Sequence, residues 1–343
     1  MSATDFQKAV AAFLDEMQFS RGKSPRTCEI YDLALKRLAE YSAGLGKETP
    51  LDLTGDDLIL FSGRWLYDKG VAVNGRRPYI GALRSFFKWC AKTGVAKNIA
   101  TGLEYPKLAS KLPIRMTLTN AEKILHKPDL SQFSGLRDSA MLHIMMGCGI
   151  RVSALIGINE GDFIADSISN EPRLLVKVRE KGGREQIKLL PREADLAVRM
   201  YLESPELAAI DRVIRDGVEK GDKVVFVSVA NRNLLPDEYV GELRRLSRHS
   251  VSQMMEKYGR RAGVPADQLH PHALRHLFGT EMLESDVDLA RAQQLMGHID
   301  PKSTLIYVHL SAVKNAKELD RANPLAKMNT PISQFLAKMK SVS

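Results

Sequence analysis

Helical periodicity runs through most of this sequence, and a proline-bounded stretch interrupts it. The stretch from Pro106 to Pro113, with lysines nearby, is typical of a linker between domains. A chain of 343 residues is also too long for one comfortable hydrophobic core. We therefore expect a first domain at residues 1–108, a linker at 109–116, a second domain at 117–323 and a tail at 324–343.

The first domain is expected to be helical throughout. Ser24 and Pro25 form a helix start, because the serine side chain can cap the helix and proline suits its first position. Asp52–Tyr67 and Arg76–Lys92 continue the pattern as further helices. The apolar positions at helical spacing are Phe6, Val10, Phe13, Leu14, Met17, Tyr31, Leu35, Leu38, Leu58, Phe61, Leu66, Tyr79, Leu83, Phe86 and Phe87.

The last of these helices carries four cations and no acid. They are Arg76, Arg77, Arg84 and Lys88. Contact with phosphate groups and an ordinary solvated face are equally open interpretations of this pattern. The whole chain has a formal charge of +9, and residues 1–110 hold 16 basic and 12 acidic residues, so both domains are basic. That balance is expected if both touch one polyanion.

The second domain begins with a helix start at Thr117. A long apolar helix follows from Leu136 to Ile158, broken at Gly147–Ser153. Gly147 and Gly149, which shortly precede Arg151, indicate that the backbone comes close to a neighbour and that the guanidinium is aimed at an anion. A structural salt bridge is the alternative.

One segment has the alternation of β-strands. Leu174, Val176 and Val178 alternate and Ile187 and Leu189 resume the pattern, which predicts a hairpin with Lys181 at its tip. Such a lysine either reaches into a groove and delivers a proton or is a solvated turn residue. After Ser247 a further helix is expected, running from Arg248 to about Arg261. The fold class expected is therefore mainly α with a small antiparallel β-sheet (α+β).

The stretch from His270 to Tyr307 gathers reactive side chains. Pro271 marks the start of a helix. On this helix His272, Arg275 and His276 share one face, and the apolar residues occupy the other. His298 and Tyr307 follow in a second unit.

This group of side chains suits a phosphate, which arginine can hold bidentately near a helix N-terminus. The tyrosine is then a candidate nucleophile. Its free pKa of about 10 means that the site must recover about 4 kcal/mol from nearby cations and a proton acceptor. Ordinary packing roles for the tyrosine and histidines are the alternative. His272 and His276 have the spacing of metal ligands, but Arg275 would repel a cation, so no metal site is expected.

Cysteine usage and hydropathy indicate a cytoplasmic protein. Cys28, Cys90 and Cys148 are widely spaced and suit reduced, buried thiols. No signal peptide opens the sequence, and no apolar run is long enough for a membrane span.

These motifs, taken together in order and spacing, resemble the signature of the tyrosine recombinase, or phage integrase, family. The matching residues are Gly149–Ser153, Lys181–Gly183, His272–His276, Leu295–His298 and Tyr307. In the first domain, Ser24–Thr27 with Tyr31 and Ala82–Trp89 are similar to the family's helical DNA-clamping domain. The resemblance covers residues 5 to 320, approximately.

The resemblance implies site-specific recombination of DNA by a two-domain clamp. Tyr307 would attack a scissile phosphate, form a 3′-phosphotyrosyl link and release a 5′-hydroxyl. Arg151 and Arg275 would clamp the non-bridging oxygens and stabilise the transition state. Neither ATP nor a metal would be needed, so no cofactor is expected.

The other implied roles concern protons and DNA contacts. Lys181 would protonate the leaving 5′-oxygen, His272 would serve as base or proton shuttle, and His298 would hydrogen-bond the phosphate. His276 is expected to be supporting. The residues expected to contact DNA are Arg76, Arg77, Arg84, Lys88 and Arg248.

One departure from the family pattern lies three residues after the first arginine, where Ala154 replaces the usual acid. Such an acid would orient neighbouring groups, so we expect its absence to affect a detail of support or regulation and not the main chemistry. The tail carries apolar residues that a short segment cannot bury alone. We expect it to dock on a neighbouring protomer in a tetramer on DNA, with packing on its own domain as the alternative. A free monomer, nucleoid association and accessory DNA-bending or directionality proteins are compatible with this expectation.

Three rival functions come from other classes. A type IB topoisomerase would share the arginines, lysine, histidine and tyrosine but would act as a monomer. A relaxase-type nuclease would use His270 and His272 as a metal pair. A DNA-binding protein without catalysis would not depend on Tyr307.

Overall fold

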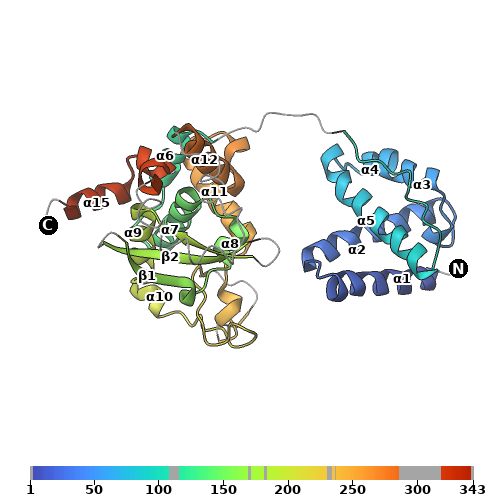
Figure 1. Ribbon diagram of the computed structural model, residues 1–343, viewed down its shortest axis with the longest axis horizontal. Helices are drawn as coiled ribbons and strands as arrows, with labels where there is room; N and C mark the ends of the chain where they lie inside the picture. The colour runs from blue at the N-terminus through green and yellow to red at the C-terminus, as the bar shows by residue number, and fades with distance from the viewer. Residues whose placement is uncertain are drawn as a thin grey trace. The chain divides into compact units, whose positions relative to one another are not determined.

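The computed structural model describes residues 3–107, 116–168, 171–180, 184–229, 234–235, 237–285 and 318–340. The chain divides into two compact units between Leu112 and Pro113 (Figure 1). Most of the expected linker and three expected site residues, Lys181, His298 and Tyr307, lie outside the described residues. None of the described helices is both long and apolar enough to cross a lipid bilayer.

The N-terminal unit is helical, as expected. Its elements are α1 (Ala3–Asp15), the π-helix η1 (Glu16–Ser20), α2 (Pro25–Gly44), the 3₁₀ turn η2 (Pro50–Asp52), α3 (Gly55–Leu60), the π-helix η3 (Phe61–Trp65), α4 (Leu66–Asp68) and α5 (Val73–Thr93). The helix expected over Asp52–Tyr67 begins slightly later, at Gly55, and continues without a break to Asp68. A 3₁₀ turn precedes it, and a π-turn at η3 lies between α3 and α4.

Local capping defines where several of these helices begin and end. The Ser24 side chain accepts a hydrogen bond from the Thr27 amide and Pro25 opens α2, which confirms the predicted start. Thr54 and Asp57 cap the N-terminus of α3 reciprocally. α5 ends at Gly94, whose φ of +74° is a conformation that favours glycine.

Aromatic side chains fill the core of the N-terminal unit, where α1, α2 and α5 pack together. The Phe13 ring lies edge-on to Phe86 at 5.4 Å and to Trp89 at 5.8 Å between centroids. The Trp89 indole Nε1 donates to the Glu16 carboxylate at 2.6 Å. This bond ties η1 to α5, so the polar end of a buried indole is satisfied.

The C-terminal unit combines helices with one sheet. Its helices and 3₁₀ turns are α6 (Leu118–Leu125), α7 (Phe133–Cys148), α8 (Val152–Ile156), η4 (Glu160–Asp162), α9 (Arg192–Leu202), α10 (Pro205–Ala208), η5 (Gly241–Arg244), α11 (Arg248–Arg261), η6 (Ala266–Gln268), α12 (Pro271–Glu284), η7 (Pro324–Lys327) and α15 (Pro331–Lys340). Helix α7 is central and packs against α9 and α12. The predicted starts at Thr117, Ser247 and Pro271 are confirmed.

The sheet is antiparallel, with the order β1 (Phe163–Ile168), β2 (Glu171–Arg179), β3 (Glu185–Leu189). The hairpin of β2 and β3 was expected, whereas β1 was not. In β2 the residues Leu174, Val176 and Val178 are buried, as their alternation predicted. The prediction for β3 was wrong, because Gln186 and Lys188 are its buried residues. They pair with Val178 and Val176, so they lie on the inner face of the sheet.

The tail divides into two parts. Leu325, Met328 and Ile332 are buried, and the first two belong to the core of their own unit. Further along α15, Phe335 is 45% exposed and Met339 is 60% exposed. The tail through Ile332 therefore packs on its own domain, while Phe335 and Met339 of the last helix face outward.

Candidate active site and nucleic-acid interface

Arg151 lies at a sharp break between α7 and α8. The break is made by Gly149, whose φ of +59° ends α7 and which leaves no space for a side chain. A Cβ atom there would lie 2.4 Å from the Phe278 ring of α12. Arg151 then becomes the N-cap residue of α8, with an extended backbone. The glycine that the sequence marked as a close approach thus brings α7 against α12 and turns Arg151 outward.

The Arg275 side chain extends from α12 to the break between α7 and α8. It is buried, and its Nη1 donates to the Gly149 carbonyl oxygen at 2.5 Å. A guanidinium is costly to bury unless hydrogen bonds and opposite charge satisfy it. The break in α7 supplies one of those hydrogen bonds, so the two arginines predicted from widely separated motifs are brought together.

An acid that the sequence reasoning missed joins the two arginines. Glu180, the residue after β2, forms an ion pair with Arg151 through Oε2, and its Oε1 lies 3.6 Å from Arg275 Nη1. The Glu180 side chain is only 4% exposed, and that of Arg275 is 6% exposed. An acid directly before the hairpin lysine was the available signal. Its partners could not be read from the sequence.

His272 lies on the exposed side of α12 beside these cations. Burial lowers the pKa of His272, and the positive charges of His276, Arg275 and Arg151 lower it further. The His272 and His276 rings meet edge-to-face at 4.6 Å between centroids. His270 instead caps α12, because its ring nitrogen accepts a hydrogen bond from the Ala273 amide at 3.0 Å. A neutral His272 imidazole at physiological pH can accept a proton.

A buried lysine borders the arginine pair and was not foreseen. Burial lowers the pKa of Lys188 to about 8; Cys148 and Glu180 oppose the shift, and Arg275 and Arg151 add to it. All three cysteines are buried and free, as expected. Burial also raises the pKa of the Cys148 thiol to about 12, which keeps it protonated at neutral pH.

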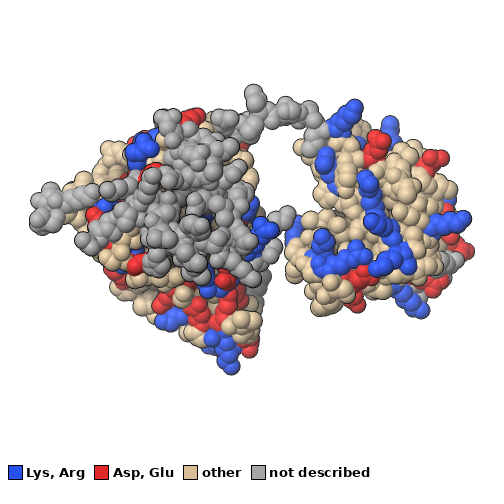
Figure 2. All heavy atoms as spheres, in the orientation of Figure 1, with Lys and Arg blue, Asp and Glu red and all other residues tan. Residues whose placement is uncertain are grey.

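The three expected arginines of α5 all donate to backbone oxygens, and two of them also lie over an aromatic ring. Arg76 donates to the backbone oxygens of Val71 and Gly63, so its guanidinium helps to hold the fold. Arg77 and Arg84 lie over the Tyr105 ring, at 4.9 and 5.5 Å from its centroid. Lys88 is exposed. In Figure 2, lysine and arginine side chains gather on the viewed face of this unit, where Figure 1 places α2 and α5.

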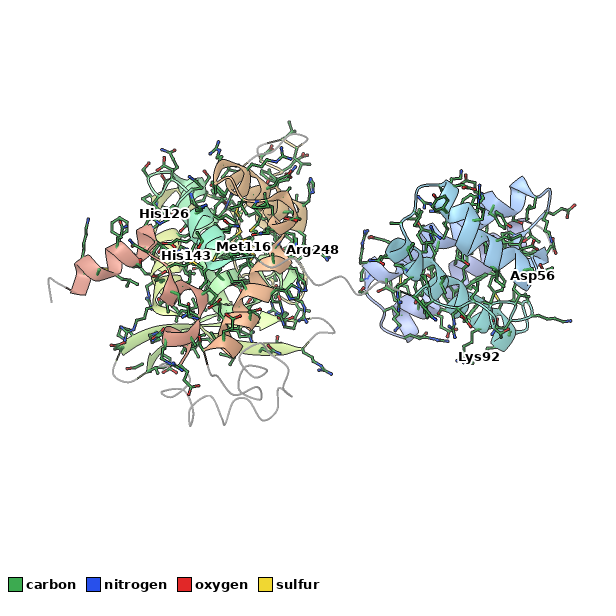
Figure 3. The ribbon with its side chains drawn as sticks, turned by 90° about the horizontal axis from the view of Figure 1, so that it is seen from above. Asp56, Lys92, Met116, His126, His143 and Arg248 are labelled. Carbon is green, nitrogen blue, oxygen red and sulfur yellow. The ribbon has the colours of Figure 1, made fainter. Side chains whose placement is uncertain are left out.

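Arg248 is the first residue of α11 and is exposed. Figure 3 shows it at the edge of the C-terminal unit. The amide groups of a helix N-terminus and an exposed guanidinium both favour an anion. DNA contact by Arg248 and by the α5 cations stays a prediction.

A metal pair at His270 and His272 finds no support among the described residues. No group of three or more His, Cys, Asp or Glu side chains in those ranges could hold a metal ion. The His270 ring nitrogen is instead engaged as a helix cap.

Known proteins resemble this chain along most of its length. The model of the phage integrase family matches residues 115–314. The tyrosine recombinase XerC of Yersinia pestis is 31% identical over 332 residues, which is 94% of this chain and 98% of that protein.

Two solved structures share the fold. XerH site-specific recombinase bound to its palindromic difH substrate, in a post-cleavage complex, has a TM-score of 0.60 at 18% identity, covering 87% of this chain and 82% of that one. A lambda integrase tetramer bound to a Holliday junction has a TM-score of 0.57 at 16% identity, covering 88% of this chain and 76% of that one. Because the family model spans more than half of the sequence and a relative aligns over nearly all of it, this chain belongs to the phage integrase family of tyrosine recombinases.

Proposed function

We propose that this chain is a site-specific DNA recombinase that cuts and rejoins strands through a covalent 3′-phosphotyrosyl intermediate. The observation that carries the proposal is the convergence of Arg151 and Arg275 on one place, with His272 within electrostatic reach. Two guanidinium groups and one carboxylate leave net positive charge, which suits the single negative charge of a phosphodiester.

The arginines would each hold a non-bridging oxygen of the scissile phosphate. Tyr307 would pass its proton to His272 as its oxygen bonds to phosphorus. The bond from phosphorus to the 5′-oxygen would break, and Lys181 would supply the proton that makes the leaving 5′-hydroxyl. His298 would hydrogen-bond the phosphate. Because the phosphodiester energy is kept in the tyrosyl link, the 5′-hydroxyl of a second strand could reverse the step without ATP or a metal.

The partner we propose is double-stranded DNA, bound by both units. A formal charge of +9 and the basic face over α2 and α5 support this assignment (Figure 2). Such a protein would act in the cytoplasm, on DNA of the nucleoid. Its affinity would fall steeply with salt concentration, because each phosphate contact releases counterions.

We further propose that the active form is a tetramer on paired DNA sites. The lambda integrase complex is described as a tetramer on a Holliday junction. In this chain, α15 presents Phe335 and Met339 outward, and a second protomer is the partner that we infer for them. The tail through Ile332 stays with its own domain, so any exchange would involve only the exposed residues of α15.

Covalent capture of DNA tests the proposed chemistry. Purified protein is incubated with fragmented DNA in EDTA and then denatured, and any DNA that remains attached is sequenced to define the site. A nicked duplex of that site should trap a protein–DNA adduct with the wild-type chain. Tyr307→Phe should abolish the adduct, and Arg275→Lys should reduce it by about a hundredfold or more. An undiminished adduct with Tyr307→Phe would contradict the proposal.

Strand exchange separates recombination from topoisomerase activity. Two linear duplexes that carry the captured site and differ in length should yield recombinant lengths with the wild-type chain. Relaxation of supercoiled DNA with no exchange between duplexes would instead favour the type IB topoisomerase function.

A further inference from the structure

We propose that Glu180 is a positioning residue that holds Arg151 and Arg275 as a single phosphate clamp. This inference rests on the function proposed above. One carboxylate contacts both guanidinium groups, with Oε2 paired to Arg151 and Oε1 at 3.6 Å from Arg275. The three residues come from three separate elements, which are the start of α8, the middle of α12 and the end of β2.

A clamp for phosphate needs a fixed distance between its donors. Two guanidinium groups repel each other, and each sits on a side chain with several rotatable bonds. A shared carboxylate offsets that repulsion and restricts both side chains before substrate arrives. Preorganised donors stabilise a transition state without further rearrangement, which is the property that Glu180 would supply.

Burial shows on which side of the clamp the carboxylate lies. The side chains of Glu180 and Arg275 are 4% and 6% exposed, whereas that of Arg151 is 35% exposed. Incoming DNA can therefore reach Arg151 more readily than it can reach the buried carboxylate. This order indicates a support behind the arginines rather than a carboxylate that occupies the phosphate position.

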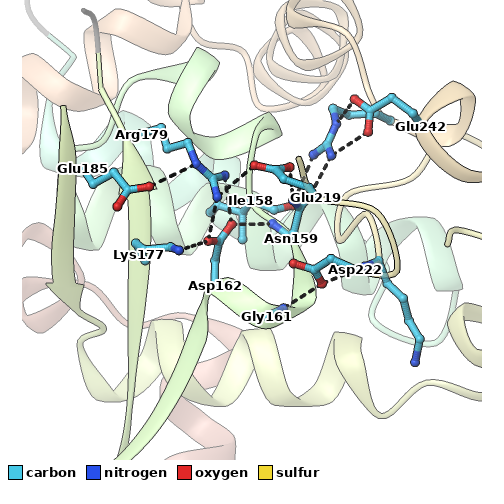
Figure 4. Close-up of polar contacts among 12 residues, drawn as sticks. Ile158, Asn159, Gly161, Asp162, Lys177, Arg179, Glu185, Glu219, Asp222 and Glu242 are labelled. Atoms are coloured by element: carbon cyan, nitrogen blue, oxygen red, sulfur yellow. Dashed lines mark hydrogen bonds and ion pairs between the residues drawn. The ribbon is translucent and has the colours of Figure 1, made fainter. Parts of the chain in front are cut away.

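The strand that carries Glu180 is itself held in place. Arg179, the preceding residue, points to the other face of the sheet and pairs with Asp162 at 3.4 Å and with Glu219 at 2.9 Å (Figure 4). Figure 4 also shows Lys177 paired with Asp162, at 3.4 Å. These contacts fix the end of β2, so the backbone that carries the Glu180 carboxylate is held in position.

The same position links the clamp to the proposed general acid. The Glu180 amide donates to the Arg184 carbonyl oxygen at 2.7 Å, which joins the described ends of the two hairpin strands. Lys181 follows Glu180 directly in the sequence. One peptide unit therefore joins the residue that would hold the arginines to the residue that would protonate the leaving oxygen.

Glu180 can also replace the acid that is missing at Ala154, where the family pattern has a carboxylate that orients neighbouring groups. That residue is buried and carries no charge, so it cannot orient either arginine. The carboxylate beside Arg151 comes from the end of β2 instead of from α8. The support of the arginines is thus present, but from another element.

The test compares Glu180→Gln with Glu180→Asp and with Glu185→Gln. Glu185 lies in the same hairpin, is half exposed, and pairs with Arg179 rather than with the clamp, so it is the matched control. We expect Glu180→Gln to slow single-turnover cleavage of the nicked duplex by about ten- to a hundredfold, with DNA affinity within about twofold. Glu180→Asp should recover part of the rate, and Glu185→Gln should match the wild type.

If Glu180 had a purely structural role, Glu180→Gln would lower DNA affinity and melting temperature together. The cleavage rate would then not fall while DNA affinity stayed unchanged. A Glu180→Gln rate within twofold of the wild type would overturn the inference. So would a faster rate, because it would mean that the carboxylate blocks the phosphate position.

A second readout does not depend on cleavage. Nitrogen NMR of the arginine side chains in the full chain should show slow rotation for the Arg151 and Arg275 guanidinium groups, assigned with Arg→Lys variants. That restriction should be lost in Glu180→Gln and kept in Glu185→Gln. If the wild-type chain formed no DNA adduct, the proposed function would fail, while these spectra would still decide whether Glu180 holds the arginines. Unrestricted guanidinium groups in the wild type would overturn the inference.

Discussion

Replacing Glu193 with glutamine should stabilise the protein at alkaline pH and leave it unchanged at acid pH. Glu193 lies on α9 beneath the start of the tail, where the Thr330 hydroxyl donates to its carboxylate at 3.2 Å. The His143 Nε2 lies 3.9 Å away, and the Glu193 side chain is only 11% exposed. Figure 3 shows His143 inside the C-terminal unit. Glutamine keeps the size of the side chain and an oxygen acceptor but removes the charge.

The magnitude follows from the shifted pKa. Burial raises the pKa of Glu193 from 4.5 to about 7, and hydrogen bonds from Thr330 and Ser333 act in the opposite direction. The folded state therefore keeps a proton that the unfolded chain has already lost. The stability associated with this proton is fully present below pH 4.5 and is lost as the pH rises through about 7. At about 1.4 kcal/mol for each pKa unit, the loss is about 3 kcal/mol.

The assay is thermal unfolding of both proteins between pH 4.5 and 8.5. The free energy of unfolding of Glu193→Gln, relative to that of the wild type, should rise by about 3 kcal/mol over this range. For a unit of this size that corresponds to about 6 to 12 °C in melting temperature. Burial lowers the pKa of His143 to about 4, so its titration destabilises both proteins equally at acid pH and cancels in the difference. Glu203→Gln, at an exposed position just after α9, should show no such trend. A difference in unfolding free energy between variant and wild type that stays constant with pH would show that the buried Glu193 carboxyl does not retain its proton in the folded state.

Three other predictions concern the site and the tail. Gly149→Ala should destabilise the chain by more than about 1 kcal/mol in denaturant unfolding, because of its φ of +59° and the Phe278 ring, and should slow cleavage by displacing the carbonyl that Arg275 uses. Leu325→Ala should cost about 2 to 5 kcal/mol in the same assay, since this side chain is buried in its own unit. Phe335→Ser should change stability by less than about 0.5 kcal/mol and weaken synapsis of two DNA sites in sedimentation measurements.

Features determined by a few neighbouring residues could be predicted from the sequence. The caps at Ser24, Thr117 and Ser247 are found where they were expected, because a hydroxyl and the next amide groups suffice to make them. The break at Gly149 was also predictable, since glycine is the residue that such a backbone favours. The fold class followed from these local signals together.

Features that depend on distant partners could not be predicted in the same way. In the sequence, nothing distinguishes Glu180 from any other acid beside a turn. Its role depends on Arg151 and Arg275, which α8 and α12 bring next to it. Ile187 and Leu189 were expected to continue the alternating pattern, but alternation alone cannot say which residues of β3 lie against Val176, and Lys188 is the residue that does.

The contacts of the tail also depend on distant partners and could not be predicted from the sequence. Its apolar spacing predicted burial, but not that Leu325 packs in its own core while Phe335 stays exposed. The positions of Lys181, His298 and Tyr307 in the site stay predictions of the sequence.

The most direct measurement is the chemical location of the covalent bond. The wild-type adduct on a nicked duplex of the captured site is digested with protease and nuclease, and the modified peptide is identified by mass spectrometry. We expect one nucleotide attached through its 3′-phosphate to the oxygen of Tyr307, and no adduct from Arg151→Ala. A nucleotide attached through a 5′-phosphate, or to any residue other than Tyr307, would contradict the proposed mechanism.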